Sequence, residues 1–182
     1  MPGRISSDAR AACSRRLSAV CFVLVLGAAS TAQADSISAG AAPGCTLHLG
    51  AAQARELRQY RGKVVYLDFW ASWCTSCVLS FPYMNQLTRD FGAQGLEVVG
   101  VDMDEHPEDG QRFLARHPAV FDVASGANAA CARAFGVKAM PSSFLIDRRG
   151  VIRERREGFQ PGEANRLRSG IQALLAEPAP GT

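Results

Sequence analysis

Two cysteines separated by two residues, Cys74 and Cys77, directly follow Trp73. This spacing could serve as a structural disulfide, as half of a metal site, or as a pair that cycles between dithiol and disulfide. A disulfide across two intervening residues closes a very small loop, so it removes little entropy from the unfolded chain and is a poor crosslink. A structural zinc site needs two further Cys or His ligands at a matching spacing. The remaining candidates stand singly: Cys45, Cys131, His48, His106 and His117. The spacing therefore favours a redox pair.

Around these cysteines the hydrophobic pattern predicts a strand followed by a helix. Residues 64–70, VVYLDFW, are apolar on both alternating faces, which is typical of a central strand covered on both sides. From residue 76 to 91 apolar residues recur every three or four positions, as on one face of a helix, with Pro82 expected to kink it. The pair would thus lie at a helix N-terminus, where free backbone N–H groups and the helix dipole favour the thiolate.

The rest of the chain alternates predicted strands with predicted helices. Further strands are expected over residues 46–49, 96–101, 120–123, 143–147 and 151–157. Further helices are expected over residues 51–60, 107–116, 128–135 and 163–176. The last two strands are joined by a turn at Gly150, so they form a hairpin. This alternation indicates an α/β domain with a mixed sheet, whose working site lies beyond the carboxyl ends of its central strands.

The first 34 residues have the organisation of a secretory signal peptide. Four arginines precede a short apolar run over residues 17–29, and Ala32 and Ala34 form a small-x-small cleavage site. An uncleaved membrane anchor is the alternative, although the run is short for a hydrocarbon core of about 30 Å. Without this segment, which holds 4 basic and 1 acidic residues, the 20 basic and 17 acidic residues of the chain become 16 and 16. A net charge of zero gives no electrostatic argument for a nucleic-acid partner.

Beyond the signal peptide we expect a flexible leader over residues 35–43, a single domain over residues 44–177, and a disordered tail over residues 178–182. An exported chain is in an oxidising compartment, where thiols tend to pair. The four cysteines outside the signal peptide allow three connectivities. Which of these connectivities is expected depends on the role of Cys74 and Cys77.

Three segments together resemble the thioredoxin superfamily: LDFWASWCTSC at residues 67–77, the proline five residues later, and GVKAMPSSFLID at residues 136–147. The signal peptide, the HLG…LRQYRGKVV lead-in and the MPSSFLIDRRG ending are most similar to the exported TlpA/ResA group of thiol-disulfide oxidoreductases. The resemblance covers about residues 44–177. It implies a thioredoxin-like α/β fold, with a central mixed sheet flanked by helices, an N-terminal extension and an inserted segment.

The resemblance also implies roles for single residues. Cys74 aligns with the nucleophile and Cys77 with the resolving cysteine. Asp68 aligns with a buried carboxylate, whose raised pKa would suit proton exchange with Cys77; a solvent-exposed strand-end carboxylate is the alternative. Trp73 would form a wall beside the site, or else pack in the core.

Pro141 aligns with the cis-proline of the superfamily, an ordinary trans loop proline being the alternative. The backbone around Met140 would then pair with an extended substrate segment. By parity, Cys45 and Cys131 would form a second, structural disulfide worth about 4 kcal/mol in the chain-entropy model. Two separate buried thiols are the alternative.

The function implied is that of a periplasmic reductase of disulfides in exported proteins, such as cytochrome c or copper-site assembly substrates. Its electrons would come from a membrane-embedded thiol donor, and the reaction needs no bound cofactor and no metal. Thr75 and Ser76 between the cysteines, without a proline, leave the direction of electron flow open. An oxidase or isomerase using the same pair, and a copper- or haem-handling chaperone, are therefore the alternatives.

Overall fold

The computed structural model describes residues 40–49, 53–125, 128–179 and 181. The described residues form one compact unit, while the predicted signal peptide and residues 35–39 lie outside the described part of the chain. Of the helices within the described residues, none is long and apolar enough to cross a membrane. The described end of the predicted flexible leader is paired: Ala42 N–H donates to Gly150 O at 2.8 Å and Ile152 N–H to Gly40 O at 3.0 Å.

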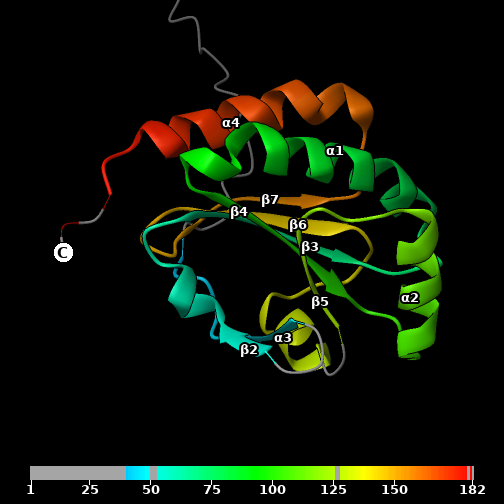
Figure 1. Cartoon of the computed structure of the whole chain (residues 1–182). Coiled ribbons are helices and arrows are strands. Elements are labelled where there is room, and N and C mark those ends of the chain that lie inside the picture. Colours follow the sequence, from blue (N-terminus) through cyan, green and yellow to red (C-terminus); the bar gives the residue numbers. More distant parts are fainter. Residues whose placement is uncertain (1–39, 50–52, 126–127, 180, 182) are drawn as a thin grey trace, which may run out of the picture. The chain divides into compact units, whose positions relative to one another are not determined.

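Seven strands in the described residues form one mixed sheet in the order β2-β1-β5-β4-β3-β6-β7 (Figure 1). They are β1 (Thr46–Leu49), β2 (Gln53–Glu56), β3 (Val64–Trp70), β4 (Leu96–Asp102), β5 (Asp122–Ala124), β6 (Ser142–Ile146) and β7 (Ile152–Glu157). At the centre, β3 pairs in parallel with β4 and antiparallel with β6. The mixed sheet that the closing hairpin predicts is confirmed.

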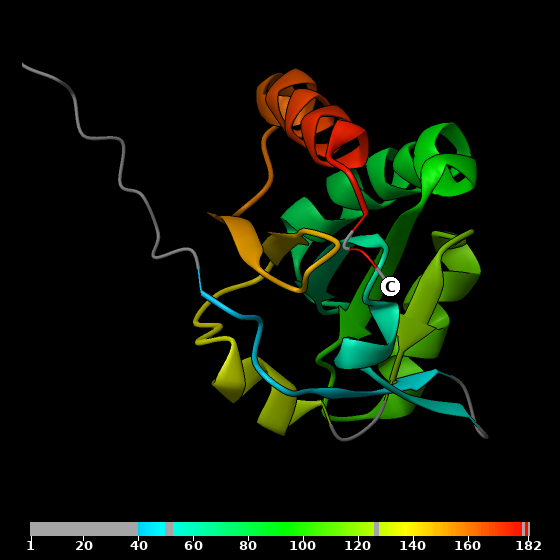
Figure 2. The same ribbon diagram turned by 90° about the vertical axis from the view of Figure 1, so that its left-hand side faces the viewer.

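Four α-helices cover this sheet within the described residues: α1 (Thr75–Phe91), α2 (Pro107–Arg116), α3 (Ala129–Ala134) and α4 (Ala164–Ala176). Helices α1 and α4 lie side by side over one face, and α3 lies on the other (Figures 1 and 2). Short 3-10 helices occupy Leu57–Tyr60, Gly92–Gln94 and Pro161–Glu163. This is the thioredoxin-like α/β architecture that the resemblance implies.

Strand β3 is the centre of two hydrophobic cores. All seven of its residues are buried, as predicted from its continuous apolar pattern. Trp70 packs under α1 and α2, with its ring centroid 4.9 Å from those of Phe81 and Phe113. On the opposite face, the ring of Phe69 packs against that of Phe135, with 5.6 Å between their centroids. Because both faces of β3 are fixed, its carboxyl end is a rigid base for the segment that leads to Cys74.

The prediction of a helix over residues 51–60 is wrong. Gln53–Glu56 instead forms β2, an edge strand antiparallel to β1, and Leu57–Tyr60 is a single 3-10 turn. Residues 51 and 52 lie outside the described residues. The segment has good helix formers, but pairing with β1 satisfies its backbone, and the 3-10 turn buries Leu57 and Tyr60. The helix expected over residues 107–116 agrees with α2 in both bounds.

Candidate active site

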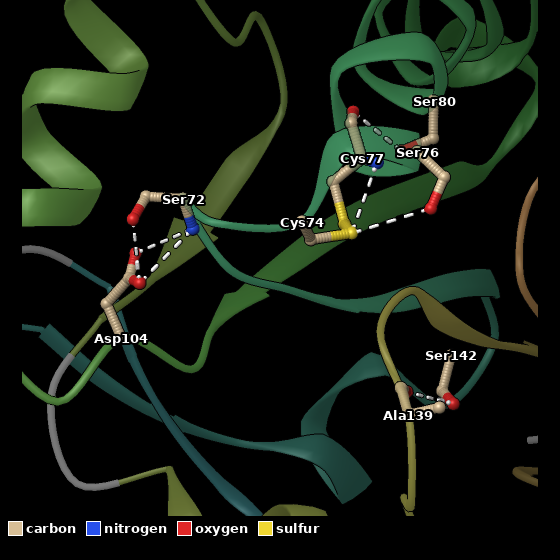
Figure 3. Close-up of a disulfide and its surroundings, with 8 residues drawn as sticks. All are labelled: Ser72, Cys74, Ser76, Cys77, Ser80, Asp104, Ala139 and Ser142. Atoms are coloured by element: carbon tan, nitrogen blue, oxygen red, sulfur yellow. Dashed lines mark hydrogen bonds between the residues drawn. A yellow bond between two sulfur atoms is a disulfide. The ribbon is translucent and has the colours of Figure 1, made fainter.

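Cys74 and Cys77 lie at the junction between β3 and α1. Cys74 is the N-cap residue of α1, and the Cys77 backbone N–H donates to Cys74 Sγ at 3.2 Å (Figure 3). The structure joins the two in a disulfide, with their Cα atoms 5.3 Å apart. Cys74 retains 5% exposure, whereas Cys77 is fully buried. After reduction, the sulfur at the helix N-terminus would face the positive end of the helix dipole, which favours the thiolate.

Asp68 lies inside the core, with 1% of its surface exposed. Strand alternation places its side chain on the face of β3 that carries Tyr66 and Trp70. Those two residues belong to the same core cluster as Cys74 and Cys77. Among the described residues Asp68 Oδ2 has no hydrogen-bond partner, and burial raises the pKa of this carboxyl group well above its usual value. The carboxyl group therefore keeps its proton at a higher pH than an exposed aspartate does.

A cis peptide bond precedes Pro141, at the start of β6. Ser142 pairs with Phe69, which places Pro141 beside the carboxyl end of β3, where the cysteine segment begins. Its carbonyl accepts the Gly158 N–H at 2.8 Å, and Met140 is half-buried against both cores.

Trp73 is the most exposed large hydrophobic side chain among the described residues, at 69%. The preceding residue, Ser72, is held by Asp104, which follows the end of β4 (Figure 3). Ser72 and Asp104 were not identified from the sequence. Their proximity could have been found from the parallel register of β3 and β4, which pairs Trp70 with Asp102 and so brings the two following segments together.

Asp102 is a second buried carboxylate near the site, 4% exposed at the end of β4. Burial raises its pKa to about 6, although a hydrogen bond from the Asp104 N–H opposes this increase. The carboxyl group of Asp102 therefore titrates just below neutral pH.

The other two cysteines are joined in a second disulfide on the opposite side of the sheet. Cys45, just before β1, is bonded to Cys131 in α3, with a Cα–Cα distance of 5.1 Å. Both residues are buried. The bond links positions 86 residues apart, so it ties the N-terminal strands to α3. No group of three or more His, Cys, Asp or Glu side chains that could hold a metal ion occurs in the part of the chain that the structure describes.

Comparison with known proteins shows that the chain is similar to thiol-disulfide oxidoreductases. The profile of the Redoxin family matches residues 38–173. The thiol-disulfide oxidoreductase ResA of Bacillus thuringiensis subsp. konkukian is 34% identical over 108 residues, which cover 59% of this chain and 62% of that protein. The ResA of Bacillus subtilis is 33% identical over 119 residues, covering 65% and 66%. The matched part thus spans less than two thirds of these relatives' own length.

A solved structure extends the likeness to most of the domain. A Chlorobium tepidum protein, provisionally named a thiol:disulfide interchange protein DsbE, superposes with a TM-score of 0.72 at 43% identity. The match covers 76% of this chain and 97% of that one. The fold therefore agrees with the one that the resemblance implies.

Proposed function

The chain belongs to the Redoxin family of thioredoxin-like proteins, and on this basis we propose that it is a thiol-disulfide oxidoreductase whose redox-active pair is Cys74 and Cys77. One observation carries the proposal: at the N-terminus of α1 a slightly exposed cysteine precedes a fully buried one, and both are close enough to form a disulfide. This asymmetry gives the two thiols different tasks.

In the reducing direction, the Cys74 thiolate attacks one sulfur of a substrate disulfide. A Cys74–substrate disulfide forms, and the first substrate thiolate leaves and takes up a proton. Cys77 then loses its proton and attacks Cys74 Sγ, which forms the Cys74–Cys77 disulfide and releases the second substrate thiolate. Two electrons pass from the protein dithiol to the substrate, so no bound cofactor is required.

Asp68 is the proposed acceptor of the Cys77 proton. Its buried position and raised pKa suit a group that exchanges protons near neutral pH. It shares a core face with the fully buried Cys77, where solvent bases have little access. An exposed carboxylate with its ordinary pKa would be a much weaker base for a thiol.

The exposed Trp73 and the segment at Met140 and Pro141 are the proposed substrate-binding surface. Trp73 supplies apolar area on one side of the cysteine pair. Pro141 lies next to the end of β3, and the backbone near Met140 is proposed to pair with an extended substrate segment. The Cys45–Cys131 disulfide is assigned a structural role, because it lies on the opposite face of the sheet in a separate core cluster.

The proposed location is the periplasm, and the proposed substrates are disulfides of exported proteins, including those of cytochrome c or copper-site assembly. The predicted signal peptide and the named activity of the ResA and DsbE relatives support this choice. An oxidising compartment cannot keep the pair reduced, so we propose a membrane-embedded thiol donor as the electron source.

Reduction of insulin by the mature protein with dithiothreitol as electron source tests the activity. Cys74→Ser should abolish it, and Cys77→Ser should accumulate a substrate mixed disulfide visible by non-reducing electrophoresis. The Cys45→Ser/Cys131→Ser double variant is the matched control, which removes the other disulfide and should retain turnover. Undiminished turnover in Cys74→Ser would contradict the proposal.

A further inference from the structure

The segment between β3 and α1, residues 71–73, brings the exposed Trp73 to the cysteine pair and is held at two points. At the first, the Cys74 N–H donates to Ala71 O at 3.1 Å and closes a turn. At the second, the Asp104 carboxylate accepts the Ser72 backbone N–H at 2.9 Å (Oδ2) and 3.2 Å (Oδ1). Asp104 Oδ1 also accepts the Ser72 hydroxyl at 2.9 Å (Figure 3). Both hydrogen-bond donors of Ser72 are thus held by one carboxylate, immediately before Trp73.

Asp104 is itself fixed at the carboxyl end of β4, in the centre of the sheet. Its backbone N–H donates to Oδ1 of the buried Asp102 at 2.9 Å. Met103 N–H donates to Trp70 O at 2.9 Å, and Asn128 Nδ2 donates to Asp102 O at 3.0 Å. The position of the Ser72–Trp73 backbone is therefore set by the end of β4.

We propose that Asp104 is a positioning residue for thiol exchange at Cys74: by holding Ser72, it fixes Trp73 as a preorganised wall for the substrate. The inference rests on the proposed function and deepens it. Hydrogen bonds to a carboxylate are stronger than those between neutral groups. An exposed aromatic side chain on a fixed backbone loses less entropy when a partner docks on it than one on a mobile loop. Asp104 contacts Ser72, so it acts through the loop.

The test compares Asp104→Ala with the wild-type mature protein, both with their disulfides formed. The chain has two tryptophans, so fluorotryptophan NMR gives one resonance each for Trp70 and Trp73, assigned with Trp73→Phe. We expect the Trp73 resonance to shift and narrow while that of the buried Trp70 stays unchanged. In insulin reduction we expect KM to rise about 10-fold and kcat to change less than two-fold, because binding loses preorganisation.

Three variants separate positioning from loss of charge or loss of folding. Asp109→Asn removes a carboxylate in the first turn of α2, which pairs with Arg112, and should leave KM and both resonances at wild-type values. Asp104→Asn keeps an oxygen that can accept both Ser72 groups, and should restore most of the wild-type behaviour. Ser72→Ala removes only the hydroxyl bond and should be intermediate; it decides the test if urea unfolding shows that Asp104→Ala does not fold.

The inference is overturned if a folded Asp104→Ala keeps the wild-type Trp73 resonance and KM, or if Asp109→Asn reproduces its effects. If the wild-type protein does not reduce insulin, the proposed function fails. The NMR comparison then decides on the Ser72 anchor by itself: an unchanged Trp73 resonance in Asp104→Ala overturns it.

Discussion

The Cys77 backbone N–H donates to the sulfur of Cys74 at 3.2 Å, so the first cysteine caps the helix in which the second is buried. This relationship makes the two thiols unequal. The sulfur of Cys74 accepts a hydrogen bond and Cys74 retains 5% exposure, while Cys77 lies wholly in the core.

We therefore expect reduced Cys74 to react with iodoacetamide at least about 10-fold faster than Cys77, because thiolate character and access both favour it. The measurement is mass spectrometry of tryptic peptides over a time course at neutral pH. A Cys77→Ser variant is the control, since it leaves Cys74 alone in the pair. Equal labelling rates for the two cysteines would contradict the assignment of Cys74 as the nucleophile.

Asp68→Asn should stabilise the protein at neutral pH and slow its turnover. The folded-state pKa of Asp68 is raised because burial disfavours the charge, so the wild type loses stability as pH rises from the unfolded pKa through the folded one. The variant has no carboxyl proton to lose, so it avoids this loss of stability. Insulin reduction should fall by about 100-fold or more if the carboxylate is a general base.

Urea unfolding of both proteins between pH 3.5 and pH 8 checks this prediction, with the difference in unfolding free energy vanishing at the acid end. An Asp68→Asn variant with wild-type turnover would show that the carboxylate takes no part in the reaction.

Asp147 should have the opposite pH dependence. Burial favours a higher pKa, but hydrogen bonds from the Val151 N–H, the Arg153 guanidinium and the Arg149 N–H lower it overall. Its contribution is therefore present above the unfolded pKa and is lost as pH falls through the folded one. Asp147→Asn should cost about 1–3 kcal/mol at pH 7, on the scale of lost hydrogen bonds to a charged group.

The same series of urea unfolding experiments measures the contribution of Asp147 to stability. The unfolding free energy of Asp147→Asn should lie below that of the wild type at pH 7, and the difference should shrink as pH falls below the unfolded pKa and through the folded one. A deficit that persists unchanged in acid would mean that Asp147 acts through packing alone.

The Cys45→Ser/Cys131→Ser double variant should lose about 2–4 kcal/mol of stability, because a long loop is no longer closed in the unfolded state. Its rate of insulin reduction at 25 °C should stay within about two-fold of the wild-type rate, because Cys45 and Cys131 belong to the core cluster that does not contain Cys74 and Cys77. Non-reducing urea unfolding gives the first value and the insulin assay the second. Abolished turnover in a folded double variant would instead assign this disulfide a part in the reaction.

Local patterns were sufficient where one element determines its own structure. The continuous apolar pattern of β3 predicted that strand, and the helix expected over residues 107–116 has the bounds of α2. The position of Cys74 at a helix N-terminus followed from the periodicity of the next fifteen residues or so. The strand β2 was missed because its structure depends on pairing with β1, which composition does not show.

The link between Ser72 and Asp104 was missed for a related reason. Thirty-two positions separate the two residues, and only the parallel register of β3 and β4 makes them neighbours. The Cys45–Cys131 pairing was predicted from parity, while the spacing itself left three connectivities open.

The equilibrium reduction potential of Cys74–Cys77 tests the proposed reductase most directly. It would be measured in the Cys45→Ser/Cys131→Ser variant against glutathione or dithiothreitol buffers, so that only the Cys74–Cys77 disulfide contributes to the measured equilibrium. A reductase supplied by a thiol donor should have a potential near or below about −250 mV, on the thioredoxin side of the scale. A potential near about −120 mV would mean that the dithiol is the stable form and that the protein oxidises its partners.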